Sequence, residues 1–381
     1  MYPGALMADI DPTPAQAPRL ATDSMKLVVP GLERVAQSIA RRLRTTRGDS
    51  VTVAQEDLGH DLEFKGFLHD HALGGMIHGG LSREAAANQA MLLASHLLYF
   101  INFEIHRRKT FWVSPSLAYL LTRTKLDIDG ELLKPPFPSC SFVFTDTASL
   151  ALVEELLRSH EPQWIAEVGA PRVVTVHVTE TGTDDPECVG LNVDVLLDPL
   201  TGTGWPYLYS RNLLVRPRDR LEAILDSHFA DIDTEALDPV FSSRELKKLL
   251  HLVINAILYS TSAEVDSVKI TSPLAQLQRA VEKKKSGEKR RRAQRQVARF
   301  RNEATGEDVF YLPGKIPISQ VEQLSKIEGS KSGGQLMTRF MVRGHWRTAN
   351  PSWNDQRPRW ISPYWKGPDL ATVIEREYEM K

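Results

Sequence analysis

Residues 173–179 read Val-Val-Thr-Val-His-Val-Thr, an alternation of valine with more polar side chains. In an extended chain, successive side chains point to opposite sides, so Val174, Val176 and Val178 share one face. The other face carries His177 and two threonines. This pattern predicts a strand in an antiparallel sheet, with one face buried and the other in contact with water.

Similar runs of β-branched and aromatic residues lie on both sides of this one and are separated by glycine-, aspartate- and proline-rich turns. They cover Phe137–Thr145, Val189–Leu197 and Tyr207–Val215. Apolar residues at helical intervals predict helices over 31–45, 82–106, 148–158, 220–229 and 243–260. We therefore expect an α+β fold, a mainly antiparallel sheet covered by helices.

Charge is distributed very unevenly along the 381 residues, although the chain as a whole carries only −1. Residues 279–301 hold eleven Lys or Arg against two Glu, and residues 331–366 hold seven against one Asp. An acidic body that carries basic elements late in the chain is typical of proteins that contact nucleic acid or another polyanion. The predicted organisation is a disordered tail (1–22), an acidic α/β body (23–278), a basic helical linker (279–301) and a basic, tryptophan-rich β module (302–381).

The C-terminal module combines arginines with aromatic rings, since four of the seven tryptophans lie between positions 346 and 365. If residues 338–347 form one strand, its arginines and His345 share a face opposite Trp346. Arginine binds phosphate through two donors, and an exposed tryptophan can stack on a base. The alternative is a module with a tryptophan core and a solvated arginine rim. The candidate nucleic-acid-binding residues are Arg339, Arg343, His345, Trp346, Arg347, Arg357, Arg359, Trp360, Trp365 and Lys366.

The same residues carry a family resemblance. The stretch Arg343-Gly344-His345-Trp346, followed by Arg357-x-Arg359-Trp360, resembles the C-terminal signature of the type V anti-CRISPR A-two family. The preceding residues 302–318 are similar to that family's lead-in. The resemblance implies a protein that recognises the nascent N-terminus of the effector nuclease and triggers loss of its messenger RNA. The basic insert, the longer N-terminus and the Tyr364-Trp365-Lys366 ending depart from the family's pattern.

Three hypotheses about function follow. The first is an interaction protein of a mobile element or its host that lowers expression of a target. Its basic C-terminal part would bind nucleic acid, with RNA rather than DNA the expected kind, or the translating ribosome, and its body would bind a protein partner. The second is a metal-independent ribonuclease in which His345 transfers protons and Arg343 and Arg347 stabilise the transition state. The third is a structural phage or plasmid protein that self-associates through its tryptophans.

The basic run in 279–301 is a second candidate surface for phosphate. Placed on a helix, several of its cations fall close to one stripe, from which they could neutralise a nucleic-acid backbone without reading its sequence. The alternative is a solvated linker helix. The candidate residues are Lys285, Lys289, Arg292, Arg295 and Arg299.

Other classes of function find no support in the sequence. The histidines at positions 69, 71 and 78 lie beside glycines without a metal-binding helical motif, so we expect a polar loop and no metal. Phosphate-loop, dinucleotide-binding and nucleophile-elbow motifs are absent, and no cofactor is expected. Cys140 and Cys188 read as buried small hydrophobes. The absence of a signal peptide and of a long apolar run predicts a protein of the reducing cytoplasm, without a membrane span.

Overall fold

The protein is described by a computed structural model. The described residues are 31–48, 52–144, 154, 171–183, 187–199, 207–230, 244–263, 281, 287–288, 290–295, 308–312 and 340–366. The tail predicted over 1–22 lies outside them, as do most of the helix predicted over 148–158 and most of the basic segment 279–301.

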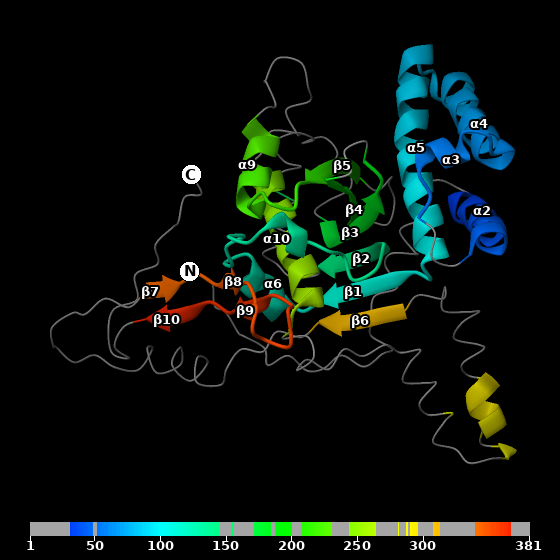
Figure 1. The fold of residues 1–381 in the computed structure, drawn as a ribbon. Helices are drawn as coiled ribbons and strands as arrows, with labels where there is room; N and C mark the ends of the chain where they lie inside the picture. The colour runs from blue at the N-terminus through cyan, green and yellow to red at the C-terminus, as the bar shows by residue number, and fades with distance from the viewer. Residues whose placement is uncertain are drawn as a thin grey trace, which may run out of the picture.

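Six strands form one mixed sheet in the order β5-β4-β3-β2-β1-β6 (Figure 1). The pairings from β2 to β5 are antiparallel, whereas β1 pairs in parallel with both β2 and β6. The class predicted from sequence, α+β, is confirmed. The strands are β1 (Lys109–Val113), β2 (Ser139–Phe144), β3 (Pro171–Thr181), β4 (Val189–Pro199), β5 (Tyr207–Val215) and β6 (Asp308–Leu312).

Strand β6 brings late sequence into the sheet of the acidic body. Phe310 on β6 lies in register with Phe111 on β1, which in turn lies in register with Phe142 on β2. The ring of Phe111 stacks on both neighbours, with centroids 5.2 Å away in each case. Stacked rings of this kind stabilise a pairing beyond the area that they bury. Residues 308–312 are therefore part of the same core as the body.

The alternation on β3 is present, but its polar face is not in contact with water. Thr175, His177 and Thr179 are as buried as Val176 and Val178. The reason is a helix, α5 (Arg83–Ile105), that lies on the polar face and places the centroid of the Tyr99 ring 3.9 Å from that of the His177 ring. The expectation of one wet face is wrong, because a partner element covers the threonines and the histidine.

Helices cover both faces of the sheet. On the valine face, α6 and α10 share a hydrophobic cluster with Val176 and Val178, and α5 packs on the opposite face. Ser82 begins α5 as predicted, since its Oγ accepts the Ala85 N–H at 3.1 Å. Within the described part of the chain, no helix has the length and apolar character needed to cross a bilayer. The α-helices are α2 (Leu32–Arg47), α3 (Gln55–Leu58), α4 (Leu62–Gly79), α5 (Arg83–Ile105), α6 (Pro115–Leu121), α9 (Leu221–Ala230) and α10 (Arg244–Thr261).

Helix α4 replaces the loop that the glycines suggested. It runs continuously through the histidines at positions 69, 71 and 78 and packs against α2 and α5. Packing outweighs the weak helix propensity of glycine when a helix has a buried residue such as Phe64 to anchor it. Among the residues that the structure describes, no group of His, Cys, Asp or Glu is arranged to hold a metal ion.

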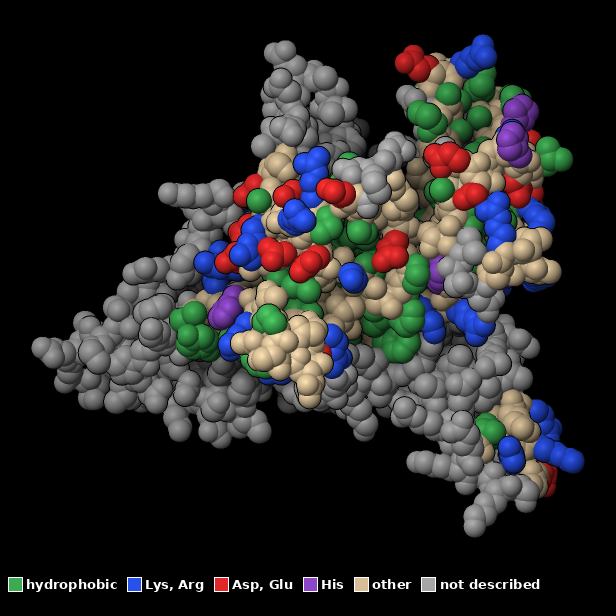
Figure 2. Space-filling model, in the orientation of Figure 1, with side chains coloured by type: hydrophobic (Ala, Val, Ile, Leu, Met, Phe, Trp, Pro, Cys, Tyr) green, Lys and Arg blue, Asp and Glu red, His purple; other side chains and the backbone are tan. Residues whose placement is uncertain are grey.

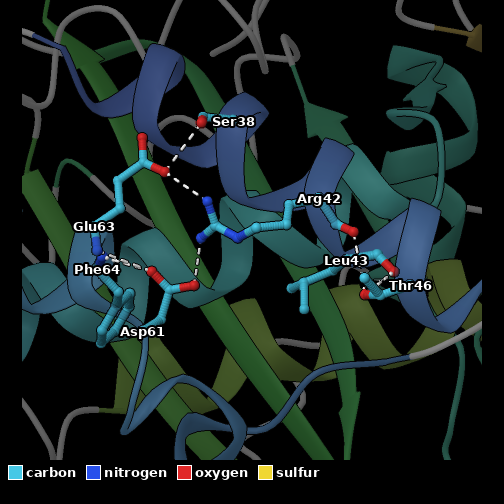
Figure 3. Close-up of polar contacts among 7 residues, drawn as sticks. All are labelled: Ser38, Arg42, Leu43, Thr46, Asp61, Glu63 and Phe64. Carbon is cyan, nitrogen blue, oxygen red and sulfur yellow. Dashed lines mark hydrogen bonds and ion pairs between the residues drawn. The ribbon is translucent and has the colours of Figure 1, made fainter.

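Arg42 joins α2 to the start of α4 (Figure 3). Its guanidinium forms ion pairs with Asp61 and, at 3.0 Å, with Glu63. Asp61 Oδ1 also accepts the N–H groups of Glu63 and Phe64, each at 3.0 Å, so the same carboxylate caps α4. Ser38 adds a hydrogen bond to Glu63 at 3.0 Å. The helical end of the molecule is therefore held by polar contacts as well as by its core.

Candidate nucleic-acid interface

The C-terminal residues form two small antiparallel sheets beside the main one. The first pairs β8 (His345–Arg347) with β9 (Arg359–Ile361), and the second pairs β7 (Phe340–Val342) with β10 (Tyr364–Lys366). Residues 340–347 are therefore not one continuous strand, although His345 and Arg347 are exposed and Trp346 is buried, as the alternation predicted.

Strands β7 and β8 are separated at Arg343 and Gly344 because the backbone of Gly344 forms hydrogen bonds with the body instead. The Gly344 N–H donates to the Arg123 carbonyl at 3.0 Å, and the Lys125 N–H donates to the Gly344 carbonyl at 2.8 Å.

Glycine is required at position 344 because of this close approach. A Cβ placed there would lie 2.7 Å from Pro363 Cδ and 2.7 Å from Thr124 Oγ1. A Cβ in a folded protein does not approach non-bonded heavy atoms so closely. A larger residue at position 344 would therefore push the neighbouring segments apart. The glycine of the Arg-Gly-His-Trp motif thus has a structural role.

The two motif tryptophans point into the core. Trp346 is 4% exposed and Trp360 is 8% exposed, and both belong to the hydrophobic cluster of the main sheet. The indole N–H of Trp346 donates to Asn255 Oδ1 on α10 at 2.7 Å, and that of Trp360 donates to Thr124 Oγ1 at 3.0 Å. A ring buried in this way offers no face to a base, so we leave both tryptophans out of the interface. For them the core alternative fits.

The outward side of β8 and β9 is cationic. His345, Arg347 and Arg359 are exposed, and the two arginines lie directly opposite each other in the register. The ring of Trp353, in the loop between the strands, lies 5.1 Å from the Arg347 guanidinium carbon and 4.2 Å from that of Arg359. Figure 2 shows Lys and Arg side chains on either side of this loop. Two arginines thus share one indole, a cation–π arrangement that orients both guanidinium groups.

Arg357 is engaged locally. Its Nε donates to Asp355 Oδ1 at 3.0 Å and its Nη2 donates to Asp355 Oδ2 at 2.8 Å. These hydrogen bonds lower the pKa of the Asp355 carboxyl to about 2. Arg357 therefore contributes less free charge than the arginines of β8 and β9.

Two cations that sequence reasoning missed come from the body. Arg123 and Lys125 flank Thr124, which forms the parallel bridge to Gly344. Thr124 is buried where its hydroxyl accepts the Trp360 indole N–H, whereas its two neighbours are not buried. Lys125 is exposed and Arg123 half-buried. No signal in the sequence places these residues beside a segment more than 200 positions later.

Arg343 is half-buried and lies near α10. Burial first, and then the charges of Arg343 and Lys247, lower the pKa of His251 to about 4. His251 is itself buried, so it does not join His345 on the surface as a second proton-transfer group. Acid–base chemistry at this surface would have to use His345 without His251.

The remaining sequence candidates fall in three groups. Arg292 and Arg295 are exposed on a short helical piece that Figure 1 shows well away from β8 and β9. Trp365 and Lys366 have their backbone in β10, but their side chains are not described. The others lie outside the described residues: Lys285, Lys289, Arg299 and Arg339.

Comparison with known proteins places these features in a family. The family model of AcrVA2-like proteins, the anti-CRISPR type V subtype A2 family, matches residues 111–367, from β1 to just after β10. A crystal structure of AcrVA2 superposes with a TM-score of 0.45 and 10% identity, covering 92% of this chain and 97% of that one. Among curated proteins there is no significant match. Because the family model covers more than half of the sequence, this chain belongs to the AcrVA2-like anti-CRISPR family.

Proposed function

We propose that this protein is an anti-CRISPR-like regulator that binds RNA, free or on the translating ribosome, through the cationic face around β8 and β9. We further propose that its acidic body binds a protein partner and that the two contacts together lower expression of a target. The single observation that carries the proposal is the exposed pair Arg347 and Arg359, directly opposed on neighbouring strands.

The electrostatics of this pair favour an anionic ligand. Like charges directly opposite each other across a sheet destabilise it, and Arg347 and Arg359 form no ion pair with any described residue. Lys125, also without an ion pair among the described residues, adds a third cation through the Thr124–Gly344 bridge. A phosphate placed between the guanidinium groups would remove the repulsion and accept hydrogen bonds from both.

The strength of such binding must depend on salt. Four cations, Arg123, Lys125, Arg347 and Arg359, could each neutralise one phosphate. At about 0.7 counterions released per phosphate of a single strand, log K should fall with log salt with a slope near −3. Removing two of these cations should reduce the slope to roughly half of that value.

The test is RNA binding by the full chain at several salt concentrations. We expect Arg347→Ala/Arg359→Ala to weaken binding and to flatten the salt dependence. Arg41→Ala/Arg83→Ala is the matched control, because it removes the same charge from exposed positions on α2 and α5. Equal losses in the two double variants would mean that only net charge matters, and no RNA binding at low salt would reject the proposal.

The α4–α5 hairpin is the described surface best suited to a protein partner. Ile77 on α4 is 69% exposed and Met91 on α5 is 65% exposed. Figure 2 shows hydrophobic side chains at this end of the molecule. Large apolar side chains left exposed on two packed helices are candidates for a binding surface. Ile77→Ser/Met91→Ser should therefore reduce capture of the target while leaving RNA affinity unchanged; unchanged capture would place the partner site elsewhere.

A further inference from the structure

Two arginine–aromatic pairs lie on the cationic face. In the first, the Arg123 guanidinium carbon lies 3.7 Å from the centroid of the Tyr119 ring, which is 39% exposed at the end of α6. In the second, Arg347 and Arg359 approach the partly exposed ring of Trp353. Cations alone are sufficient to bind phosphate. The aromatic rings therefore suggest a contact with another part of the ligand.

The backbone brings the two pairs to neighbouring positions. Arg123 directly precedes Thr124, which forms a bridge with Gly344, and Arg347 follows Gly344 by three residues. At about 3.3 Å per residue, Gly344 to Arg347 spans roughly 10 Å of strand. Lys125 follows the bridge on one chain and His345 on the other. The bridge thus places the two ring sites on neighbouring segments, separated by a length of strand that can accommodate a few nucleotides.

We infer that the RNA bound here is single-stranded and that its bases stack on the Tyr119 and Trp353 pairs while its phosphates meet the arginines and Lys125. The inference rests on the proposed RNA binding and specifies its ligand. A base stacks on an aromatic ring or on a guanidinium plane only when it is not already stacked in a duplex. In a duplex only phosphates and groove edges are accessible, and the two rings would contribute nothing.

The experiment compares three fluorescent ligands of equal length on the full chain: single-stranded RNA of mixed sequence, the same sequence as a duplex, and an abasic single strand. We expect the single-stranded RNA to bind most tightly. Tyr119→Leu and Trp353→Leu should each weaken that binding about 5- to 150-fold, the usual effect of losing one base stack, and weaken binding of the abasic strand much less, because that strand has no base to stack and loses only the orientation of the arginines. Leucine keeps an apolar side chain at each site, and far-UV circular dichroism verifies the fold.

Tyr119→Phe is the matched control, since it keeps the ring and should bind as the wild type does. Arg347→Ala/Arg359→Ala should weaken binding of all three ligands. Equal affinity for the three ligands, or a preference for the duplex, would overturn the inference while leaving RNA binding in place. Absence of binding to every ligand at low salt would overturn the proposed function itself, so the two failures are distinguishable.

Discussion

Replacing Trp346 by phenylalanine tests whether the C-terminal strands are fastened to the body by the indole hydrogen bond. The substitution keeps an aromatic ring in the core but removes the donor to Asn255 Oδ1. Asn255 is fully buried, and its Nδ2 donates to the carbonyls of Thr124 and His251. Its Oδ1 would then be left without the indole N–H.

The magnitude follows from comparing the two tryptophans. An acceptor left unsatisfied in the core costs about 1–3 kcal/mol, and the smaller ring adds about 1–2 kcal/mol of lost burial. Trp360→Phe loses similar ring atoms and its bond to Thr124 Oγ1. That hydroxyl, however, keeps its donor bond to the Leu120 carbonyl at 3.0 Å. The hydrogen bond lost in Trp360→Phe should cost only about 0.5–1.5 kcal/mol. Trp346→Phe should therefore be the more destabilising change, by about 1 kcal/mol or more.

Urea unfolding followed by far-UV circular dichroism measures both free energies without relying on tryptophan emission. A double-mutant cycle with Asn255→Leu isolates the pair, and we expect a coupling of about 1–3 kcal/mol. Equal destabilisation by the two phenylalanine variants, together with a coupling near zero, would refute the claim that the Trp346–Asn255 hydrogen bond holds the C-terminal strands to the body.

Three further predictions concern glycine, pH and cleavage. Gly344→Ala should destabilise the protein by about 1–3 kcal/mol, whereas Gly74→Ala, on α4 with open space around its Cβ, should stabilise it by about 0.5–1 kcal/mol; thermal unfolding of both checks the contrast. Burial lowers the pKa of His96 to about 4. Unfolded chains therefore take up a proton that the folded state excludes, and the contribution of His96 to stability should fall between about pH 6.5 and 4 by up to about 1.4 kcal/mol per unit, in addition to the same effect at His251. A urea midpoint that does not move over this range, or that moves equally in His96→Gln, would contradict this reasoning. Finally, if the protein cleaves RNA at the cationic face, His345→Ala should abolish cleavage with little loss of binding; a wild-type protein that cleaves no RNA, with or without divalent metal, would end that hypothesis.

Local pattern was a good guide to the elements of the body. The helices at α2, α5, α9 and α10 begin and end within a few residues of their predicted bounds, and the runs that became β2 to β5 were found as strands. These segments carry apolar residues at helical spacing or runs of β-branched and aromatic residues, and both are local signals. β1 was not predicted, because five residues, Lys109 to Val113, are too short a run to stand out.

The C-terminal motif shows where pattern alone is insufficient. Arginine and tryptophan fall on opposite faces of its strands. This alternation does not show which of the two faces is buried. Only the structure shows that Trp346 and Trp360 face Asn255 and Thr124, leaving the arginines outside. The bridge between Thr124 and Gly344 places Arg123 and Lys125 beside the C-terminal strands, although no motif near them in the sequence indicates a binding role.

By itself, the sequence determined the α+β class, the bounds of most body elements, the cationic character of the late segments and the family resemblance, which the match over residues 111–367 supports. These follow from local periodicity, composition and motif. The tertiary structure alone decided that β6 joins the main sheet, that α5 covers the polar face of β3, and that the motif tryptophans are core. The physical reason is that burial depends on which distant surface covers a segment, and residues hundreds of positions apart supply that surface.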